Sequence, residues 1–324
     1  LPRLDLTHVI DTSGAYIPGH GTPTVILLGR HRPPVSESAP IRTVMGIKGE
    51  PGVPDIPGQG MVWSAILGQV DRVDSESAFV SVSDTPRSTF AKHPWSIGGG
   101  GAADVKQTIE SAAAMTLGNE VAEIGVFGMT NADEVMLAPA SAFARRRVEL
   151  KFTRSMVLGD LVRDWFITSN ECALFPYDDH KVIPFETAPG MAKWLWPCRT
   201  TLGSRATFSK QTYFQEGRPW WEWHQIALRR AKGSTITFAE IATHNHFVLD
   251  QGGKVFKQTA PVIKLPTGAS EHAHLGLIGL LNSSVACFWL KQVCHNKGAG
   301  GDSTKLAGEP WENFFAINST KVAE

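Results

Sequence analysis

Two segments of β-branched and apolar residues near the start of the chain predict a pair of strands. Leu4–Asp11 reads LDLTHVID and Thr22–Arg30 reads TPTVILLGR, with a connection rich in glycine and proline between them. A loop of this kind between two such segments favours antiparallel pairing. Because two strands alone cannot bury both faces, we expect this pair to be part of a larger sheet.

Apolar residues at helical spacing predict three helices farther along. These are Gly60–Val70, the alanine-rich Ala102–Leu117, and Leu275–Val293, which is the longest. The apolar run of the third is interrupted by Asn282 and is shorter than the roughly 20 apolar residues that cross a bilayer. We therefore expect one long buried helix there and no membrane contact.

The remaining segments predict short strands and irregular connections. Residues 31–60 contain six prolines and several glycines, as in an irregular connector on a surface. After a domain boundary at Gly118–Asn119, short apolar segments alternate with turns. The strands expected outside the first 60 residues are Phe79–Ser83, Glu123–Phe127, Val135–Leu137, Val148–Phe152, Val162–Ile167 and Thr235–Phe238.

Composition places the chain among globular proteins. Its 324 residues are 42% hydrophobic and 19% charged, and 31 basic residues balance 31 acidic ones. That length suits two domains. With a net charge near zero, affinity for nucleic acid has to come from a local surface.

The cysteines and the first residue point to a cytoplasmic piece of a larger protein. Cys172, Cys198, Cys287 and Cys294 have no paired spacing and are interpreted as ordinary thiols. The chain opens at Leu1 with strand-like sequence and no signal peptide. We therefore expect it to have been cut from something longer.

The basic residues concentrate in one segment, Lys193–Lys232, which we call the basic-aromatic segment. It carries eight Lys or Arg residues against two Glu residues, and five of the ten tryptophans. Cations that neutralise phosphates, interleaved with rings that stack on bases, are typical of a nucleic-acid surface. A tryptophan-rich core rimmed by long basic side chains gives the same composition. Composition alone leaves both interpretations open.

Within this segment, arginines are the better candidates for reading bases, because a planar guanidinium can bind both acceptors of a guanine. Arg205, Arg218 and Arg229 are therefore favoured over Lys210 and Lys232. The full set of predicted DNA-binding residues is Arg199, Arg205, Lys210, Arg218, Trp220, Trp221, Trp223, Arg229, Arg230 and Lys232. The run Arg145-Arg146-Arg147 is expected to be a solvated face, with phosphate contact as the alternative.

Two histidine pairs raise the question of a metal site. His244 and His246, and likewise His272 and His274, have the two-residue spacing that places both side chains on one side of a strand. The paired ligand spacings that make a zinc prediction strong are missing from the sequence. We therefore expect hydrogen-bonded or solvated histidines and no metal. No serine or cysteine has the local sequence of a catalytic nucleophile.

Six phrases together resemble the C-terminal portion of the large adenine-specific DNA methyltransferases of bacterial phage defence, in the phage-growth-limitation and type 2 BREX systems. The resemblance covers nearly the whole chain and is most specific in the first phrase. The phrases are Leu6–Arg30 (LTHVIDTSGAYIPGHGTPTVILLGR), His93–Ala102 (HPWSIGGGGA), Ile124–Pro139 (IGVFGMTNADEVMLAP), Arg163–Asp178 (RDWFITSNECALFPYD), the segment containing Trp220-Trp221-Glu222-Trp223, and Leu280–Leu290 (LLNSSVACFWL).

This resemblance implies an α+β chain in three parts. Residues 1–60 would be the C-terminal strands of a methyltransferase sheet, 61–118 a helical connector, and 119–324 an α+β target-recognition domain that grips double-stranded DNA. The parent protein would transfer a methyl group from S-adenosylmethionine to a flipped-out adenine. Other phage-defence proteins are further expected partners.

The sequence departs from the family in its chemistry. The catalytic tetrapeptide Asn/Asp-Pro-Pro-Tyr/Phe is missing, and the chain's Pro-Pro lies in Arg32-Pro33-Pro34-Val35. The glycine-rich cofactor motif is missing as well. We expect both motifs upstream, no cofactor bound here, and an inactive fragment. The alternatives are a non-catalytic DNA-binding subunit of a defence complex, or a carbohydrate- or peptide-binding face built from the tryptophans.

Overall fold

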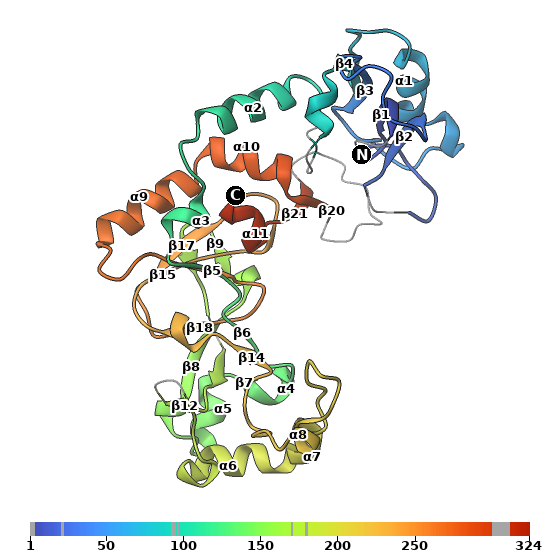
Figure 1. The fold of residues 1–324 in the computed structure, drawn as a ribbon. Coiled ribbons are helices and arrows are strands. Elements are labelled where there is room, and N and C mark those ends of the chain that lie inside the picture. The colour runs from blue at the N-terminus through green and yellow to red at the C-terminus, as the bar shows by residue number, and fades with distance from the viewer. Residues whose placement is uncertain are drawn as a thin grey trace. The chain divides into compact units, whose positions relative to one another are not determined.

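The computed structural model describes residues 4–20, 23–91, 95, 97–169, 171–178, 181–299 and 312–324. The chain divides into two compact units, and each contains two separate stretches of sequence (Figure 1). Unit 1 comprises residues 1–114 and 284–316, and unit 2 comprises residues 115–283 and 317–324.

Unit 1 is organised around a four-stranded sheet with the order β2-β1-β3-β4. β1 pairs antiparallel with β2, as predicted, and parallel with β3, while β3 and β4 are antiparallel. The elements of unit 1 are β1 (Asp5–Asp11), β2 (Val25–Arg30), β3 (Ile41–Gly46), η1 (Pro57–Gln59), α1 (Met61–Gln69), β4 (Val80–Thr85), η2 (Arg87–Phe90), α2 (Ala102–Ala112), α10 (Ser284–Val293), β20 (His295–Ala299) and β21 (Asn313–Ala316).

Strand β3 corrects the prediction of an irregular connector over residues 31–60. Ile41 and Val44 are fully buried, and Val44 packs with Ile10 of β1 and Val62 of α1. The prolines of this stretch lie before and after β3, so the strand itself keeps its donors. The predicted helices at α1 and α2 and the predicted strand at β4 are confirmed, although α2 ends five residues earlier than expected.

The single long helix predicted over Leu275–Val293 is wrong. Two helices, α9 (Glu271–Leu281) and α10, occupy this stretch, and the break lies at Asn282. The Asn282 side chain accepts from the backbone N–H of Phe247 at 2.9 Å and donates to its carbonyl at 2.8 Å, which fixes Asn282 outside the helix. Burial is partial as well, because Leu275 is 52% and Leu280 65% exposed.

Unit 2 contains two four-stranded sheets, with the orders β18-β8-β11-β7 and β17-β15-β19-β5. Three two-stranded pairs, β9 with β10, β12 with β13, and β6 with β14, complete it. Its first elements are α3 (Leu117–Glu120), β5 (Glu123–Gly125), β6 (Gly128–Met129), α4 (Asp133–Met136), β7 (Leu137–Ala138), α5 (Ala140–Arg145), η3 (Leu150–Phe152), β8 (Thr153–Val157), η4 (Gly159–Leu161), β9 (Val162–Arg163), β10 (Phe166–Ile167), β11 (Cys172–Leu174), β12 (Tyr177–Asp178), β13 (Lys181–Val182) and η5 (Phe185–Thr187).

The second half of unit 2 carries the basic-aromatic segment and the chain's end. Helix α11 packs against α3 and β5, which joins the last residues to the first ones of this unit. The remaining elements are α6 (Pro189–Leu195), η6 (Trp196–Cys198), α7 (Arg199–Gly203), α8 (Tyr213–Glu216), β14 (Gln225–Ile226), η7 (Leu228–Ala231), β15 (Thr235–Phe238), β16 (Ile241–Ala242), β17 (Phe247–Asp250), β18 (Lys254–Phe256), β19 (Val262–Lys264), α9 and α11 (Ser319–Ala323).

Three strand predictions in unit 2 need correction. The first two residues of Val135–Leu137 belong to helix α4, and strand β7 begins only at Leu137. Val148–Phe152 leads through a 3₁₀ turn, and the strand begins only at Thr153. Val162–Ile167 is not one strand but a hairpin, in which β9 and β10 flank the turn residues Asp164 and Trp165. The strand predicted at Thr235–Phe238 is confirmed, and all four of its residues are buried.

The predicted α+β class is confirmed by this mixture of small sheets and short helices. The division into 1–60, 61–118 and 119–324 stays a prediction, and the compact units follow different bounds because residues 284–316 pack with residues 1–114. Over the described residues, no single helix has the length and apolar character to cross a bilayer, and only the broken pair α9 and α10 meets that test when both are counted together.

Candidate nucleic-acid interface

The basic-aromatic segment folds into short helices whose ends are fixed by local hydrogen bonds. Pro189 occupies the first turn of α6, where its missing N–H costs nothing. Thr212 and Gln215 form a reciprocal capping box at the start of α8, and Gly217 ends α8 with a φ of 66°. The aromatic and basic side chains are therefore held on a well-defined backbone.

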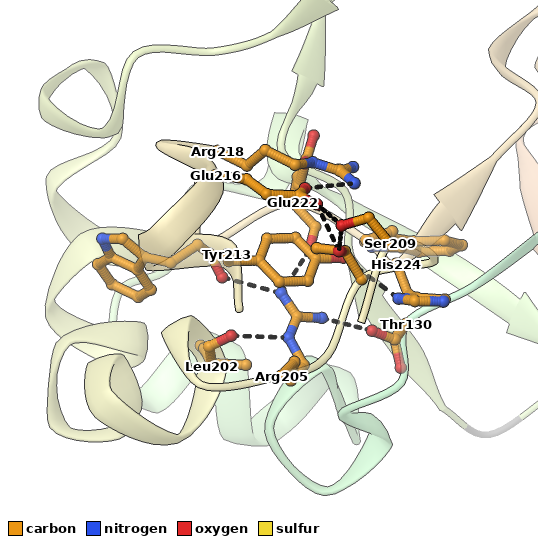
Figure 2. Close-up of polar contacts among 12 residues, drawn as sticks. Thr130, Leu202, Arg205, Ser209, Tyr213, Glu216, Arg218, Glu222 and His224 are labelled. Atoms are coloured by element: carbon orange, nitrogen blue, oxygen red, sulfur yellow. Dashed lines mark hydrogen bonds and ion pairs between the residues drawn. The ribbon is translucent and has the colours of Figure 1, made fainter. Parts of the chain in front are cut away.

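Arg205 lies at the centre of a buried network and does not face solvent (Figure 2). It is 8% exposed, and each of its three guanidinium nitrogens donates to a backbone carbonyl. The acceptors are the carbonyls of Leu202 at 2.9 Å, Thr130 at 2.5 Å, Trp220 at 2.9 Å and Glu222 at 2.9 Å. The guanidinium therefore joins α7 to two distant loops, and four of its five N–H donors are already used.

Tyr213 provides the flat surface for two of the arginines. The guanidinium carbon of Arg205 lies 4.4 Å from the Tyr213 ring centre, and that of Arg218 lies 4.9 Å from it. Burial lowers the pKa of Arg205 and raises that of Tyr213. Arg205 thus stays in place through carbonyl and ring contacts, and no acidic side chain in the described part of the chain forms an ion pair with it.

Three further arginines of the predicted DNA-binding set form ion pairs with acidic side chains. Arg218 binds Glu222 at 2.6 Å, in an i,i+4 pair. Arg229 and Arg230 both bind Glu123 on β5, and Arg230 also donates to the carbonyl of Val126. Although burial opposes it, these two arginines hold the pKa of Glu123 below its usual range. Arg229 remains 69% exposed, while Arg230 is 12% exposed.

Three of the tryptophans belong to the core of unit 2. Trp223 is 1% and Trp220 7% exposed. Trp223 donates from its indole to the carbonyl of Leu174 at 2.8 Å, and Trp221 donates to that of Ile183 at 3.0 Å. Trp220 and Trp223 are therefore buried, while Trp221 is half-buried and packs against the core cluster that contains Trp220. The interpretation of a tryptophan-rich core therefore describes Trp220, Trp221 and Trp223.

The exposed aromatic residues of the segment lie on η6, α8 and the loop between α7 and α8. Trp196 is 61%, Phe208 72% and Phe214 40% exposed. The guanidinium carbon of Arg199 lies 5.5 Å from the Trp196 ring centre and 4.9 Å from that of Phe214. Lys210 is exposed in a turn, with a φ of 65°. We call Trp196, Arg199, Phe208, Lys210 and Phe214 the exposed cation-aromatic surface.

This surface differs from the predicted site in a definite way. Arg199 and Lys210 were predicted, and no ion pair within the described ranges engages either of them. Lys232 is exposed as well, and its carbonyl accepts from Lys264. DNA contact by the ten predicted residues stays a prediction. The structure shows which of these residues have a charged group or a ring face exposed and therefore available for DNA contact.

Sequence reasoning missed an exposed aromatic pair outside the segment. Trp165 and Phe166, at the tip of the β9-β10 hairpin, are 61% and 64% exposed. Trp165 and the preceding Asp164 both have positive φ, at 71° and 45°. A two-residue turn between short apolar segments was the available signal, but Asp-Trp is not among the residue pairs that usually form such turns.

The histidine pairs do not lie on strands, the placement for which their two-residue spacing was considered. His272 and His274 lie on helix α9, not on a strand, so the two-residue spacing places them on different sides. The ring of His274 is buried and lies 2.8 Å from the carbonyl of Ser270. His244 and His246 precede β17, and their ring centres are 4.1 Å apart.

Comparison with known proteins shows similarity of the chain to an adenine-specific methyltransferase and to a restriction-modification enzyme. No protein-family model matches it. It is 46% identical over 327 aligned positions to a protein of Streptomyces coelicolor named adenine-specific methyltransferase PglX, and this similarity confirms the predicted resemblance. The match covers 99% of this chain but 27% of that protein, so the chain spans about a quarter of its relative.

A solved structure shares the fold. The chain resembles MmeI, described as a type IIL restriction-modification enzyme and solved in complex with DNA, with a TM-score of 0.51. The alignment covers 90% of this chain and 33% of MmeI, at 10% identity. At that identity the likeness concerns the fold and not individual residues.

Proposed function

We propose that this chain is the DNA-recognition portion of an adenine-specific DNA methyltransferase of bacterial phage defence. The observation that carries the proposal is the 46% identity to PglX over 99% of the chain. The fold shared with an enzyme that was solved on DNA supports it independently of sequence. In the full-length protein, S-adenosylmethionine would supply the methyl group for the adenine amine.

The chemistry itself is proposed to belong to another part of the longer protein. The tetrapeptide that holds the target adenine in this family is not in the sequence, and neither is a glycine-rich cofactor motif. The role left to this portion is to hold the duplex and to read it. We expect the 324-residue chain to transfer no methyl group by itself.

The exposed cation-aromatic surface is the proposed place of DNA contact. Arg199 and Lys210 provide charges that neutralise phosphates, and counterion release makes such contacts sensitive to salt. Trp196, Phe208 and Phe214 provide ring faces for stacking, which depends little on salt. Arg205 is assigned to the framework, since its donors are bound to carbonyls.

The test is duplex binding by the purified chain across a salt series. Replacing both Arg199 and Lys210 by alanine is expected to weaken binding and to reduce the slope of log K against log salt by about 0.9 for each phosphate that is no longer neutralised. Trp196→Ala is expected to weaken binding with the slope unchanged. Fluorescence anisotropy with a labelled duplex measures both quantities.

A charge-matched control uses two other exposed lysines of unit 2. Replacing Lys151 and Lys181 by alanine removes the same charge, and both residues are exposed. Equal slopes of log K against log salt for the two double variants would contradict a DNA contact localised at the exposed cation-aromatic surface. Binding without steep salt dependence would favour a sugar or peptide face. Methyl transfer by the longer protein, but not by this chain, separates the proposal from a non-catalytic subunit.

A further inference from the structure

Three potential metal ligands meet at the turn of the β9-β10 hairpin in unit 2. Asp164 comes from the hairpin turn, and His244 and His246 come from the loop before β17. One ligand atom from each lies within 4.8 Å of the others. The carboxylate oxygen of Asp164 is 3.8 Å from Nε2 of His244 and 3.6 Å from Nδ1 of His246.

These separations are close to those of a coordinated zinc ion. Zinc binds imidazole nitrogen and carboxylate oxygen at about 2.0–2.2 Å, and tetrahedral ligands are then roughly 3.3–3.6 Å apart. Both separations between the carboxylate and an imidazole are within a few tenths of an ångström of this range, and the ligand atoms of the two imidazoles lie within 4.8 Å of each other. His244 is 48% and Asp164 81% exposed, so an ion can enter from solvent and keep a water ligand.

Polar contacts around the loop hold the two histidines in position. The side chain of Asn245, between the two histidines, donates to the carbonyl of Leu281 at 2.6 Å. The backbone N–H and carbonyl of Phe247, which follows His246, both form hydrogen bonds with the side chain of Asn282. Nδ1 of His244 lies 2.9 Å from the Thr243 hydroxyl. When that nitrogen carries the proton, the lone pair of Nε2 is available to a metal, as in other metal-binding histidines.

Two neighbouring groups oppose the binding of a metal ion. The backbone N–H of Asp164 donates to Nδ1 of His246 at 3.2 Å, and coordination has to displace this bond. Arg163 is the adjacent cation, and its guanidinium donates to the carbonyls of Gly159 and Val162 at 2.7 and 2.6 Å. The Asp164 carboxylate offsets its charge.

We propose that Asp164, His244 and His246 bind a divalent metal ion of the zinc type. Two imidazoles with one carboxylate suit zinc and cobalt better than magnesium or calcium, which prefer oxygen ligands. The ion would connect the hairpin turn to the loop before β17 and so fix the exposed tip residues Trp165 and Phe166. This inference does not depend on DNA binding.

The test is metal titration of the chain after removal of bound ions with EDTA. We expect one equivalent of Zn²⁺ to bind by calorimetry, and one equivalent of Co²⁺ to give the visible absorption of nitrogen and oxygen coordination. His244→Ala and Asp164→Asn are each expected to weaken binding at least tenfold. Zn²⁺ is expected to raise the melting temperature of the unchanged protein and not of these variants.

His272→Ala is the matched control, because His272 is an exposed histidine on α9 outside the cluster. It is expected to bind both metals as the unchanged protein does. Circular dichroism confirms that the variants fold. We expect them to do so, because His244 and Asp164 are both exposed. Absence of saturable binding, or binding within twofold of the unchanged protein in both His244→Ala and Asp164→Asn, overturns the proposal.

Discussion

At the scale of single residues, the position of Arg205 explains why basic composition overstates a DNA surface. A guanidinium has five donors and no acceptor, so it can bind several carbonyls whose partners are otherwise missing. Arg205 donates to four carbonyls from three separate stretches of chain, and the carbonyl of Leu202 also accepts from the backbone N–H of Arg205 at 3.4 Å. Its contribution is to join α7 to the loops at Thr130 and Trp220.

Arg205→Ala is therefore expected to destabilise the protein strongly. Each buried carbonyl left without a donor costs about 1–3 kcal/mol, so we expect the free energy of unfolding to fall by roughly 3 kcal/mol or more. Arg205→Lys should recover only part of this, because an ammonium cannot span the same acceptors. Urea unfolding, followed by tryptophan fluorescence, measures the change.

Arg199→Ala is the control for that experiment. Arg199 is exposed and contacts only ring faces in the described structure, so its removal is expected to change the unfolding free energy by less than about 1 kcal/mol. An effect at Arg205 as small as that at Arg199 would contradict the structural role. It would return Arg205 to the set of DNA-binding candidates.

At the scale of elements, helix α6 depends on a carboxylate that lies outside it. Glu149 accepts the backbone N–H groups of Gly190 and Met191 at 2.8 and 3.0 Å, and these are donors without partners inside the helix. Although burial acts in the opposite direction, these N–H groups and the nearby Lys151 hold the pKa of Glu149 below its ordinary value of 4.5.

A carboxylate whose pKa is lower in the folded than in the unfolded chain stabilises the fold above its ordinary pKa. This contribution is lost as the pH falls from about 4.5 through the lower folded pKa. Glu149→Gln is expected to lower stability at pH 7 and to approach the unchanged protein in acid. Denaturant midpoints measured between pH 7 and pH 3 test this.

The control for Glu149 is Glu186→Gln, a carboxylate in the turn before α6 that accepts neither of these N–H groups. Its stability curve is expected to follow that of the unchanged protein over the whole range. A constant difference between Glu149→Gln and the unchanged protein at every pH would show that charge at Glu149 has no part in capping.

The same scale shows what sequence could and could not predict. β1, β2, α1, β4 and β15 were predictable, because each has a local apolar period and clear turn residues. Distant partners decide the rest. Asn282 ends α9 by binding Phe247, 35 residues away, and Arg205 reaches Thr130, 75 residues away. Asp164 meets His246 across 82 residues. No local pattern contains such contacts.

At the scale of the whole molecule, unit 2 is completed by the last eight residues of the chain. Helix α11 packs on α3 and β5, and the backbone N–H of Ile317 donates to the carbonyl of Glu240 at 2.7 Å. The intervening residues 284–316 belong to unit 1. Ser283 is the last residue of unit 2 before the chain enters unit 1, and its carbonyl accepts from the side chain of Asn245 at 3.3 Å. Asn245 lies five residues after Glu240. The exit and re-entry points of unit 2 therefore both contact the stretch from Glu240 to Asn245.

This arrangement predicts that residues 115–283 reach their full stability as an independent unit only when residues 317–324 are supplied. A chain in which a short Gly-Ser linker replaces residues 284–316 is expected to unfold cooperatively and to keep the salt-dependent DNA affinity. A chain ending at Ser283 lacks α11 and should melt at a lower temperature, because α3 and β5 are then without the helix that covers them. Calorimetry and anisotropy compare the two chains.

Equal melting temperatures would show that α11 does not stabilise unit 2. An absence of DNA affinity in a well-folded linker variant would place essential DNA contacts in unit 1.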